Sequence, residues 1–157
     1  MKKTKILSQG ALIASLYVVL TLVANLIGLA NGAIQLRLSE ALTILPAFTF
    51  SAVPGLFVGC VMANIVTGAA LWDVVFGSVA TLLGAVGTYY LGKKKYLAPI
   101  YPILANTIIV PIVLRTVYGL GDAFWYLCLT VGIGEILSCG VLGMLLYGYV
   151  EKSKLFK

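Results

Sequence analysis

Histidine is absent from this 157-residue chain, and charged residues make up only 10% of it. The lack of histidine removes the commonest general base and the commonest metal ligand of proteins. Soluble domains carry about 25% charged residues, so the low charge argues against an ordinary soluble domain. No Cys-x-x-Cys pair occurs, and each cysteine lies singly in an apolar run, as expected of small packing residues: Cys60, Cys128 and Cys139.

Apolar residues dominate instead, at 61% of the chain, with a mean hydropathy of +1.07. This composition is typical of membrane proteins, and the length suits one domain, residues 1–157. The net charge is +6, but the basic residues gather at the chain ends and in one short loop. Basic clusters in such places flank membrane spans on the cytoplasmic side, so we expect no nucleic-acid partner.

Six apolar segments predict an all-α integral membrane protein, because about 20 helical residues cross about 30 Å of hydrocarbon. The first segment is long and more spans follow it, so we interpret it as a retained helix and not as a signal peptide. Asn31-Gly32 and Pro54 mark turns, and Asp73 and Asp122 are predicted N-caps. The expected spans are residues 6–28, 35–50, 54–71, 73–91, 97–118 and 122–150.

Small residues recur every fourth position in the third span, at Gly55, Gly59, Ala63 and Thr67. Such a stripe lets a neighbouring helix approach closely. The lysines predict the orientation, because six spans return the C-terminus to the side of the N-terminus. Nine of the eleven basic residues then lie on one side, which the positive-inside rule makes cytoplasmic. The two exceptions are Arg37 and Arg115.

Six of the remaining charges are predicted to lie in the outer half of the membrane, from a helical rise of about 1.5 Å per residue. They are Arg37, Glu40, Asp73, Arg115, Asp122 and Glu135, with Asn64 and Asn106 near mid-depth and Trp72 beside Asp73. A charge facing hydrocarbon costs at least about 2.5–3.5 kcal/mol, so such groups usually face a protein interior or a cavity. Several charges at one level therefore favour a polar cavity open to the outside.

Arg37 and Glu40 are three residues apart, and positions i and i+3 share one face of a helix. The alternative to a cavity is a salt bridge between these two residues that holds two helices together. A catalytic site is not expected. The segment from Gly87 to Lys94 resembles a phosphate-binding loop, but Lys94 replaces the required Ser or Thr, and no HExxH or GxSxG motif occurs. Uphill transport would therefore need an ion gradient or a partner that hydrolyses ATP.

Three stretches resemble the QueT family of queuosine-precursor transporters: RLSEALTILP (37–46), GCVMANIVTGAALWDVVFGSVATLLGA (59–85) and the three-lysine loop (93–95). This family belongs to the substrate-binding (S) components of energy-coupling-factor (ECF) transporters. The resemblance covers nearly the whole chain. It implies an S-component-like bundle in a bacterial-type plasma membrane, without enzymatic activity, cofactor or metal. The implied partners are a transmembrane coupling protein and two ABC ATPases.

The resemblance also implies an outward pocket, closed by the loop at residues 29–36, for a 7-deazaguanine such as queuine or its aminomethyl precursor. A guanine-type edge suits carboxylates, its carbonyl suits Arg or an amide, and its face suits an aromatic ring. The candidate binding residues are Arg37, Glu40, Asn64, Trp72, Asp73, Asn106, Arg115 and Glu135. In this superfamily an Ala-x-x-x-Ala pattern contacts the coupling protein, and the candidates here are Gly10, Ala11, Ala14 and Ser15. The serine departs from the pattern but stays small.

Three alternatives remain open from the sequence. The chain could bind another vitamin-like heterocycle, such as thiamine, because similar groups would serve a cationic ring. It could be a self-sufficient proton- or sodium-coupled carrier that uses Glu40 and Glu135. It could also be a structural membrane protein whose charges form only salt bridges.

Overall fold

The computed structural model describes the chain except residues 1, 30–33, 93, 120, 154, 155 and 157. Its described part contains helices and no strand. In chain order the elements are α1 (Lys2–Leu26), η1 (Leu38–Ala47), α2 (Ala52–Val66), α3 (Leu71–Leu91), η2 (Lys95–Leu97), α4 (Ile100–Thr116), α5 (Phe124–Glu135), η3 (Ile136–Leu142) and α6 (Gly143–Ser153).

Four helical stretches are long and apolar enough to cross a membrane: Lys3–Leu26, Leu71–Leu91, Lys95–Thr116 and Phe124–Ser153. The last of these combines α5, η3 and α6 into 30 residues, because the π-helical turns of η3 continue the helix without a break. The two remaining apolar helices, η1 and α2, are shorter. The structure therefore confirms an all-helical chain with several membrane-length helices, and the count of six spans remains a prediction.

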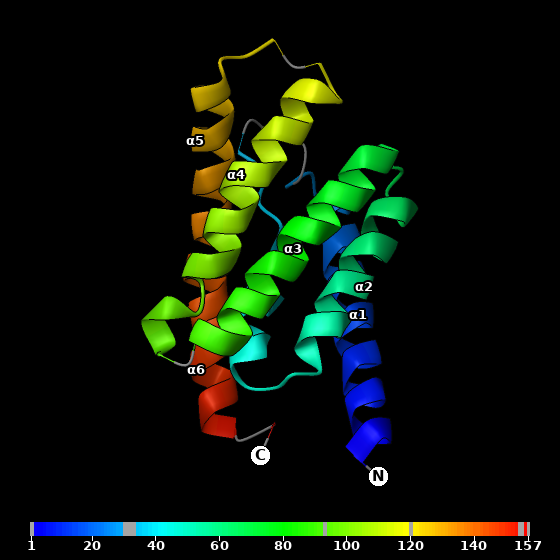
Figure 1. Ribbon diagram of the computed structural model, residues 1–157, viewed down its shortest axis with the longest axis vertical. Helices are drawn as coiled ribbons and strands as arrows, with labels where there is room; N and C mark the ends of the chain where they lie inside the picture. Colours follow the sequence, from blue (N-terminus) through cyan, green and yellow to red (C-terminus); the bar gives the residue numbers. More distant parts are fainter. Residues whose placement is uncertain (1, 30–33, 93, 120, 154–155, 157) are drawn as a thin grey trace.

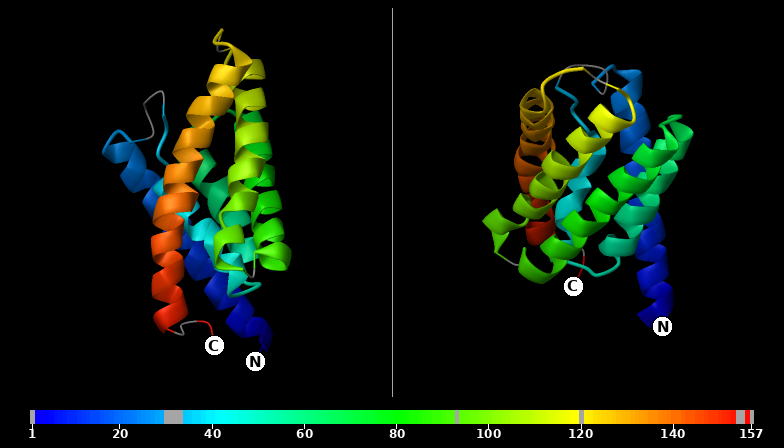
Figure 2. Two further views of the ribbon diagram at one scale, coloured as in Figure 1. Left: turned by 90° about the vertical axis from the view of Figure 1, so that its left-hand side faces the viewer. Right: turned by 45° about the horizontal axis from the view of Figure 1, so that its top comes forward.

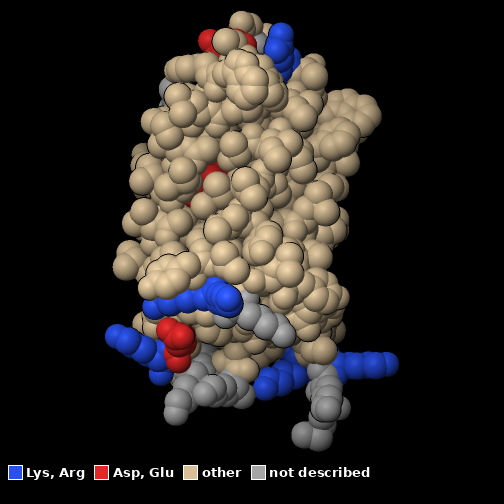
Figure 3. All heavy atoms as spheres, turned by 60° about the vertical axis from the view of Figure 1, so that its left-hand side comes forward, with Lys and Arg blue, Asp and Glu red and all other residues tan. Residues whose placement is uncertain are grey.

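Both termini lie at the same end of the bundle (Figure 1). Figure 3 shows most of the blue Lys and Arg side chains of one face at this end, and a broad band above them that is nearly free of charged residues. Large apolar side chains are exposed along the helices, for example Leu26 and Trp125 at 86% and 81%. Exposed apolar surface of this extent fits contact with lipid.

The prediction of one continuous α-helix over residues 35–50 is wrong. Gln35–Arg37 have no helical structure, and the backbone of Arg37 is extended, with φ −96° and ψ 96°. A 10-residue 3₁₀ helix, η1, follows and contains Pro46, whose ring cannot continue an α-helix. At about 2.0 Å per residue, η1 is only about 20 Å long, which is shorter than the hydrocarbon layer.

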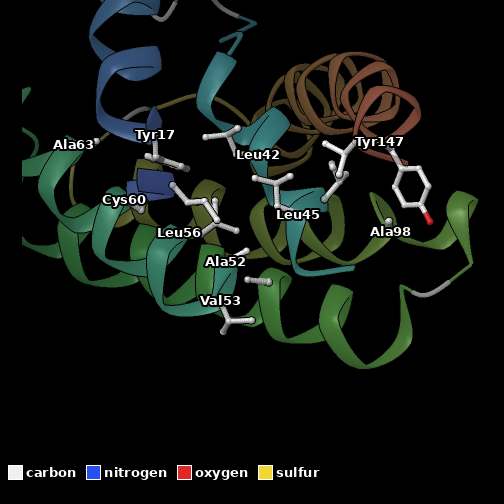
Figure 4. Packing of buried hydrophobic residues seen from close by; sticks show 14 residues of the cluster. Tyr17, Leu42, Leu45, Ala52, Val53, Leu56, Cys60, Ala63, Ala98 and Tyr147 are labelled. Carbon is white, nitrogen blue, oxygen red and sulfur yellow. The ribbon is translucent and has the colours of Figure 1, made fainter. Parts of the chain in front are cut away.

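This short helix is the centre of the bundle. Residues 39–46 are all buried, and η1 packs against α1, α2, α3, η3 and α6. Figure 2 shows it in cyan, enclosed by the longer helices. In Figure 4, Leu42 and Leu45 of η1 lie between Tyr17 of α1 and Tyr147 of α6, beside Leu56 of α2. The segment that carries Glu40 is therefore held inside the protein core.

Close packing of α1 against α2 depends on the small residues of the predicted stripe. A Cβ atom on Gly55 would lie 2.7 Å from the carbonyl oxygen of Gly10, and one on Gly59 would lie 2.8 Å from the Cβ of Tyr17. The prediction that this stripe admits a neighbouring helix is confirmed, and that helix is α1. The contact also fixes the position of Tyr17, which matters for the site described below.

Replacing Gly55 with alanine is expected to destabilise the protein by about 1–3 kcal/mol. The added methyl group would meet backbone of α1, which can move away only by separating the two helices. The measurement is the thermal unfolding midpoint in detergent. Gly148→Ala is the matched control, because a Cβ there meets nothing within 4 Å. An unchanged midpoint for Gly55→Ala would contradict the packing described here.

Candidate functional site

A polar cavity of about 280 Å³ lies at the end of the bundle remote from both termini. This volume is near the lower limit of about 300 Å³ for small-molecule sites. Its walls come from the C-terminal half of α1, the chain before η1 and the first turn of η1, the end of α2 and the residues that follow it, the start of α3, and one residue after α4. The lining residues are Tyr17, Thr21, Ala24, Asn25, Gln35, Arg37, Ser39, Asn64, Thr67, Gly68, Ala69, Asp73 and Tyr118.

Arg37 provides the positive charge of this cavity. Its backbone N–H donates to Ser138 Oγ at 3.1 Å, which anchors the extended segment to η3. All acidic side chains of the chain are described, and none has an oxygen within 4.0 Å of the Arg37 guanidinium nitrogens. The salt bridge with Glu40 that the sequence left open is therefore not formed. The guanidinium is available to a ligand.

Gly134 makes the position of this segment possible. A Cβ atom on Gly134 would lie 2.3 Å from the carbonyl oxygen of Gln35, so the extended chain rests directly on the backbone of α5. A side chain at this position would exclude Gln35 from the cavity wall. Two long-range contacts, one to Gly134 and one to Ser138, thus position Gln35 and Arg37.

Asp73 provides the negative charge. It lies in the first turn of α3, where the N-cap is Ala70, so its predicted role as N-cap is wrong; likewise α5 is capped by Ala123 and not by Asp122. Tyr118 Oη donates to Asp73 Oδ2 at 3.1 Å and accepts from the Ala70 N–H at 3.2 Å. Desolvation raises the pKa of Tyr118 above its usual value, so this phenol keeps its proton at neutral pH.

A second group of polar residues lies wholly inside the bundle. Glu40, Asn106 and Glu135 are 0%, 1% and 4% exposed. The amide Nδ2 of Asn106 donates to Glu40 Oε2 at 3.3 Å, and Cys139 Sγ donates to Glu135 Oε2 at 3.2 Å. One oxygen of each carboxylate and the Cys139 sulfur lie within 4.8 Å of one another. We call these four residues the inner cluster.

Tyr17 connects the cavity with the inner cluster. It lines the cavity, and its hydroxyl donates to Glu40 Oε1. Arg37 and Glu40 therefore do not share a helical face, because Arg37 precedes η1 in an extended conformation and Glu40 lies within the helix. Arg37 points to the cavity, whereas Glu40 is covered by Tyr17. Tyr17 thus contacts both environments.

The structure divides the predicted binding residues into three groups. Arg37, Asn64 and Asp73 line the cavity, and Glu40, Asn106 and Glu135 belong to the inner cluster. Trp72 and Arg115 are exposed and line neither. Trp72 is 57% exposed and stacks on Phe76, with 5.9 Å between ring centroids, in an apolar groove between α3 and α4. The Trp72 side chain was expected to face the cavity but faces outward, because the neighbouring Asp73 lies on the inner face of α3.

Several cavity residues were not among the predicted ones. Tyr17, Thr21 and Asn25 recur every fourth residue, and this polar stripe on an otherwise apolar helix is the signal that could have revealed them. Gln35 and Tyr118 offer no such pattern. They reach the cavity only because the extended segment and the chain after α4 pass over it.

The predicted contact residues on α1 have different surroundings. Gly10 and Ala14 pack against Gly55 and Gly59 of α2, so they stabilise the fold itself. Ala11 and Ser15 remain exposed, and the Ser15 hydroxyl bonds the Ala11 carbonyl oxygen at 2.9 Å. Residues 30–33 of the predicted closing loop lie outside the described part of the chain. The Leu36 N–H donates to the Leu29 carbonyl oxygen at 3.0 Å at its base.

Comparison with known proteins gives two matches. The model of the family described as QueT transporter matches residues 7–152. A protein of Lactococcus lactis subsp. cremoris (strain MG1363), named Queuosine precursor transporter QueT, is 34% identical over 86 residues, which are 53% of this chain. The aligned part spans about half of that relative, 50% of its length. No solved structure matches the chain.

Proposed function

This chain belongs to the QueT transporter family, and from that premise we propose that it captures a queuosine precursor as the substrate-binding component of an ECF-type importer. The observation that carries the proposal is the polar cavity, whose wall holds both the Arg37 guanidinium, with no carboxylate oxygen within 4.0 Å, and the carboxylate of Asp73. Membrane-embedded charges rarely stay without a protein partner unless they serve a ligand or a water-filled cavity.

A 7-deazaguanine base matches these groups. Its adjacent N–H donors suit the Asp73 carboxylate, which accepts hydrogen bonds only, and its carbonyl oxygen suits the Arg37 guanidinium, which only donates. Asn25, Gln35 and Asn64 add amides that both donate and accept. Stacking would fall to Tyr17 or Tyr118, which line the cavity, in place of the exposed Trp72.

The distribution of charge supports an outward-facing cavity. The described lysines near both termini and in the turn before α4 lie at the opposite end of the bundle from the cavity. By the positive-inside rule the lysine-rich end is cytoplasmic. The cavity would then open to the outside of the plasma membrane, where a scavenged base arrives.

An ATP-hydrolysing partner completes the proposal, because the chain carries no nucleotide-binding motif. We propose Ala11 and Ser15 as the contact with a transmembrane coupling protein, which would be served by two ABC ATPases. Both small residues are exposed, and Ala11 borders a groove of about 520 Å³ between α1 and α2. Small residues at four-residue spacing permit the close approach of a partner helix.

Binding in the absence of ATP tests the proposal. Purified full-length protein in detergent is expected to bind a 7-deazaguanine with a dissociation constant below about 1 μM, measured by titration calorimetry. Guanine and thiamine serve as competitors. Absence of binding to every deazapurine would contradict the proposed substrate. Uptake by the chain alone in vesicles under an imposed proton or sodium gradient would favour the stand-alone carrier instead.

A further inference from the structure

We infer that the inner cluster is a second binding subsite, one that accepts a primary ammonium group of the substrate. The inference rests on the proposed function, because the ammonium is that of an aminomethyl group on a 7-deazaguanine bound in the cavity. It assigns Glu40, Glu135 and Asn106 a ligand-binding role that the cavity itself does not require.

The charge of the inner cluster is the first argument. Two carboxylates lie together in the core, and no Lys or Arg nitrogen of the described residues is within 4.0 Å of either. Bringing carboxylates out of water costs several kcal/mol per ion unless a positive charge or a proton compensates. A bound ammonium group supplies such a charge.

Asn106 is the second and independent argument. Its side chain is 1% exposed, and its Oδ1 has no hydrogen-bond partner, although the Nδ2 of the same amide donates to Glu40. Buried amide oxygens are almost always bonded. Turning the amide over places Oδ1 towards Glu40 Oε2, which requires a hydrogen-bond donor between the two oxygens, and an ammonium group is such a donor. An ammonium group has three N–H donors, for Glu40, Glu135 and Asn106.

Tyr17 supplies the route between the two compartments. Its side chain lines the cavity, and its hydroxyl occupies one oxygen of Glu40. The aminomethyl arm of a base in the cavity would therefore meet the Tyr17 side chain on its way to Glu40. A new rotamer of Tyr17 would open the cavity to the inner cluster. Glu40 would then accept a hydrogen bond from the ammonium group in place of the Tyr17 hydroxyl.

Two nearly isosteric ligands test the inference on the unmodified protein. One is a 7-deazaguanine with an aminomethyl group at C7, and the other has a neutral nitrile there. The aminomethyl compound is expected to bind at least about tenfold more tightly, because only it carries the cation. Equal affinities would overturn the inference but leave the proposed function intact. Absence of binding by both would instead overturn the proposed function.

Substitutions of the two buried carboxylates test whether the inner cluster causes the preference for the aminomethyl ligand. Glu135→Gln is expected to weaken aminomethyl binding at least about tenfold and to leave nitrile binding within about twofold. Glu40→Gln is expected to act likewise. Glu151→Gln is the matched control, because Glu151 is a surface carboxylate paired with Lys95 at 3.7 Å. Equal losses for both ligands in Glu135→Gln would overturn the inference.

Folding and inorganic ions require their own controls. Each variant is compared with the unmodified protein by size-exclusion chromatography and by its thermal unfolding midpoint. If a variant does not fold, the comparison of the two ligands on the unmodified protein remains the deciding test. Titration with Na⁺ or Zn²⁺ tests whether an inorganic cation binds in the inner cluster instead. Nitrile binding that strengthens with either ion in the unmodified protein, and not in Glu135→Gln, would overturn the inference in favour of an inorganic cation.

Discussion

Replacing Arg37 with glutamine is expected to weaken binding of a 7-deazaguanine by about 10- to 150-fold. The guanidinium is the only basic side chain that lines the described cavity. A hydrogen bond from a charged donor contributes about 1.5–3 kcal/mol, which corresponds to this range of dissociation constants. Titration calorimetry of the two proteins measures the effect. Because Arg37 forms no salt bridge in the free protein, the substitution should leave the thermal midpoint nearly unchanged.

Arg115→Gln is the matched control for this prediction. Arg115 lies in the last turn of α4 with an exposed side chain and does not line the cavity, so its substitution should leave the dissociation constant within about twofold. Equal effects of the two substitutions would indicate a general loss of positive charge near the entrance. They would contradict the assignment of Arg37 as a direct ligand contact.

Replacing Gly134 with alanine is expected to affect both the fold and the site. The new methyl group would lie 2.3 Å from the Gln35 carbonyl oxygen, so the segment with Gln35 and Arg37 must move. Such overpacking costs about 1–3 kcal/mol of stability. Displacement of Arg37 should weaken ligand binding by about tenfold or more, the loss of one charge-assisted hydrogen bond. Thermal unfolding and titration measure the two effects.

Gly132→Ala separates this effect from helix propensity. Gly132 lies two residues earlier in α5, where a Cβ would meet only the Thr107 side chain, with its methyl group at 3.4 Å and its hydroxyl oxygen at 3.6 Å. It should therefore bind ligand as the unmodified protein does. A Gly134→Ala protein with normal affinity would show that the position of the extended segment does not determine binding.

The predicted Arg37–Glu40 pair shows where sequence reasoning failed. Helical spacing would place both side chains on one face, but helix formation begins only after Arg37, at Leu38. Pro46 and the tight 3₁₀ turns then shorten the segment to a core helix. The sequence pattern correctly predicted that charged residues of this segment face the protein interior or a cavity. It could not reveal that two charges three residues apart enter different compartments.

The stripe of small residues in α2 shows the opposite case. The four-residue spacing of Gly55, Gly59 and Ala63 predicted a close helix contact, and α1 provides it. The same spacing could not tell which small residues of α1 face α2. Gly10 and Ala14 do so, which leaves Ala11 and Ser15 on the outer surface.

The sequence by itself determined the membrane class, the helical fold and the clustering of lysine at one end, because these follow from local apolar length and local charge. Only the tertiary structure decided which polar groups meet. Asn106 reaches Glu40 across 66 positions of the chain, and Cys139 reaches the Glu40 carbonyl oxygen across 99. Contacts of such separation depend on how helices pack, which no local pattern encodes. The cavity and the inner cluster therefore became distinct only when the helices were placed together.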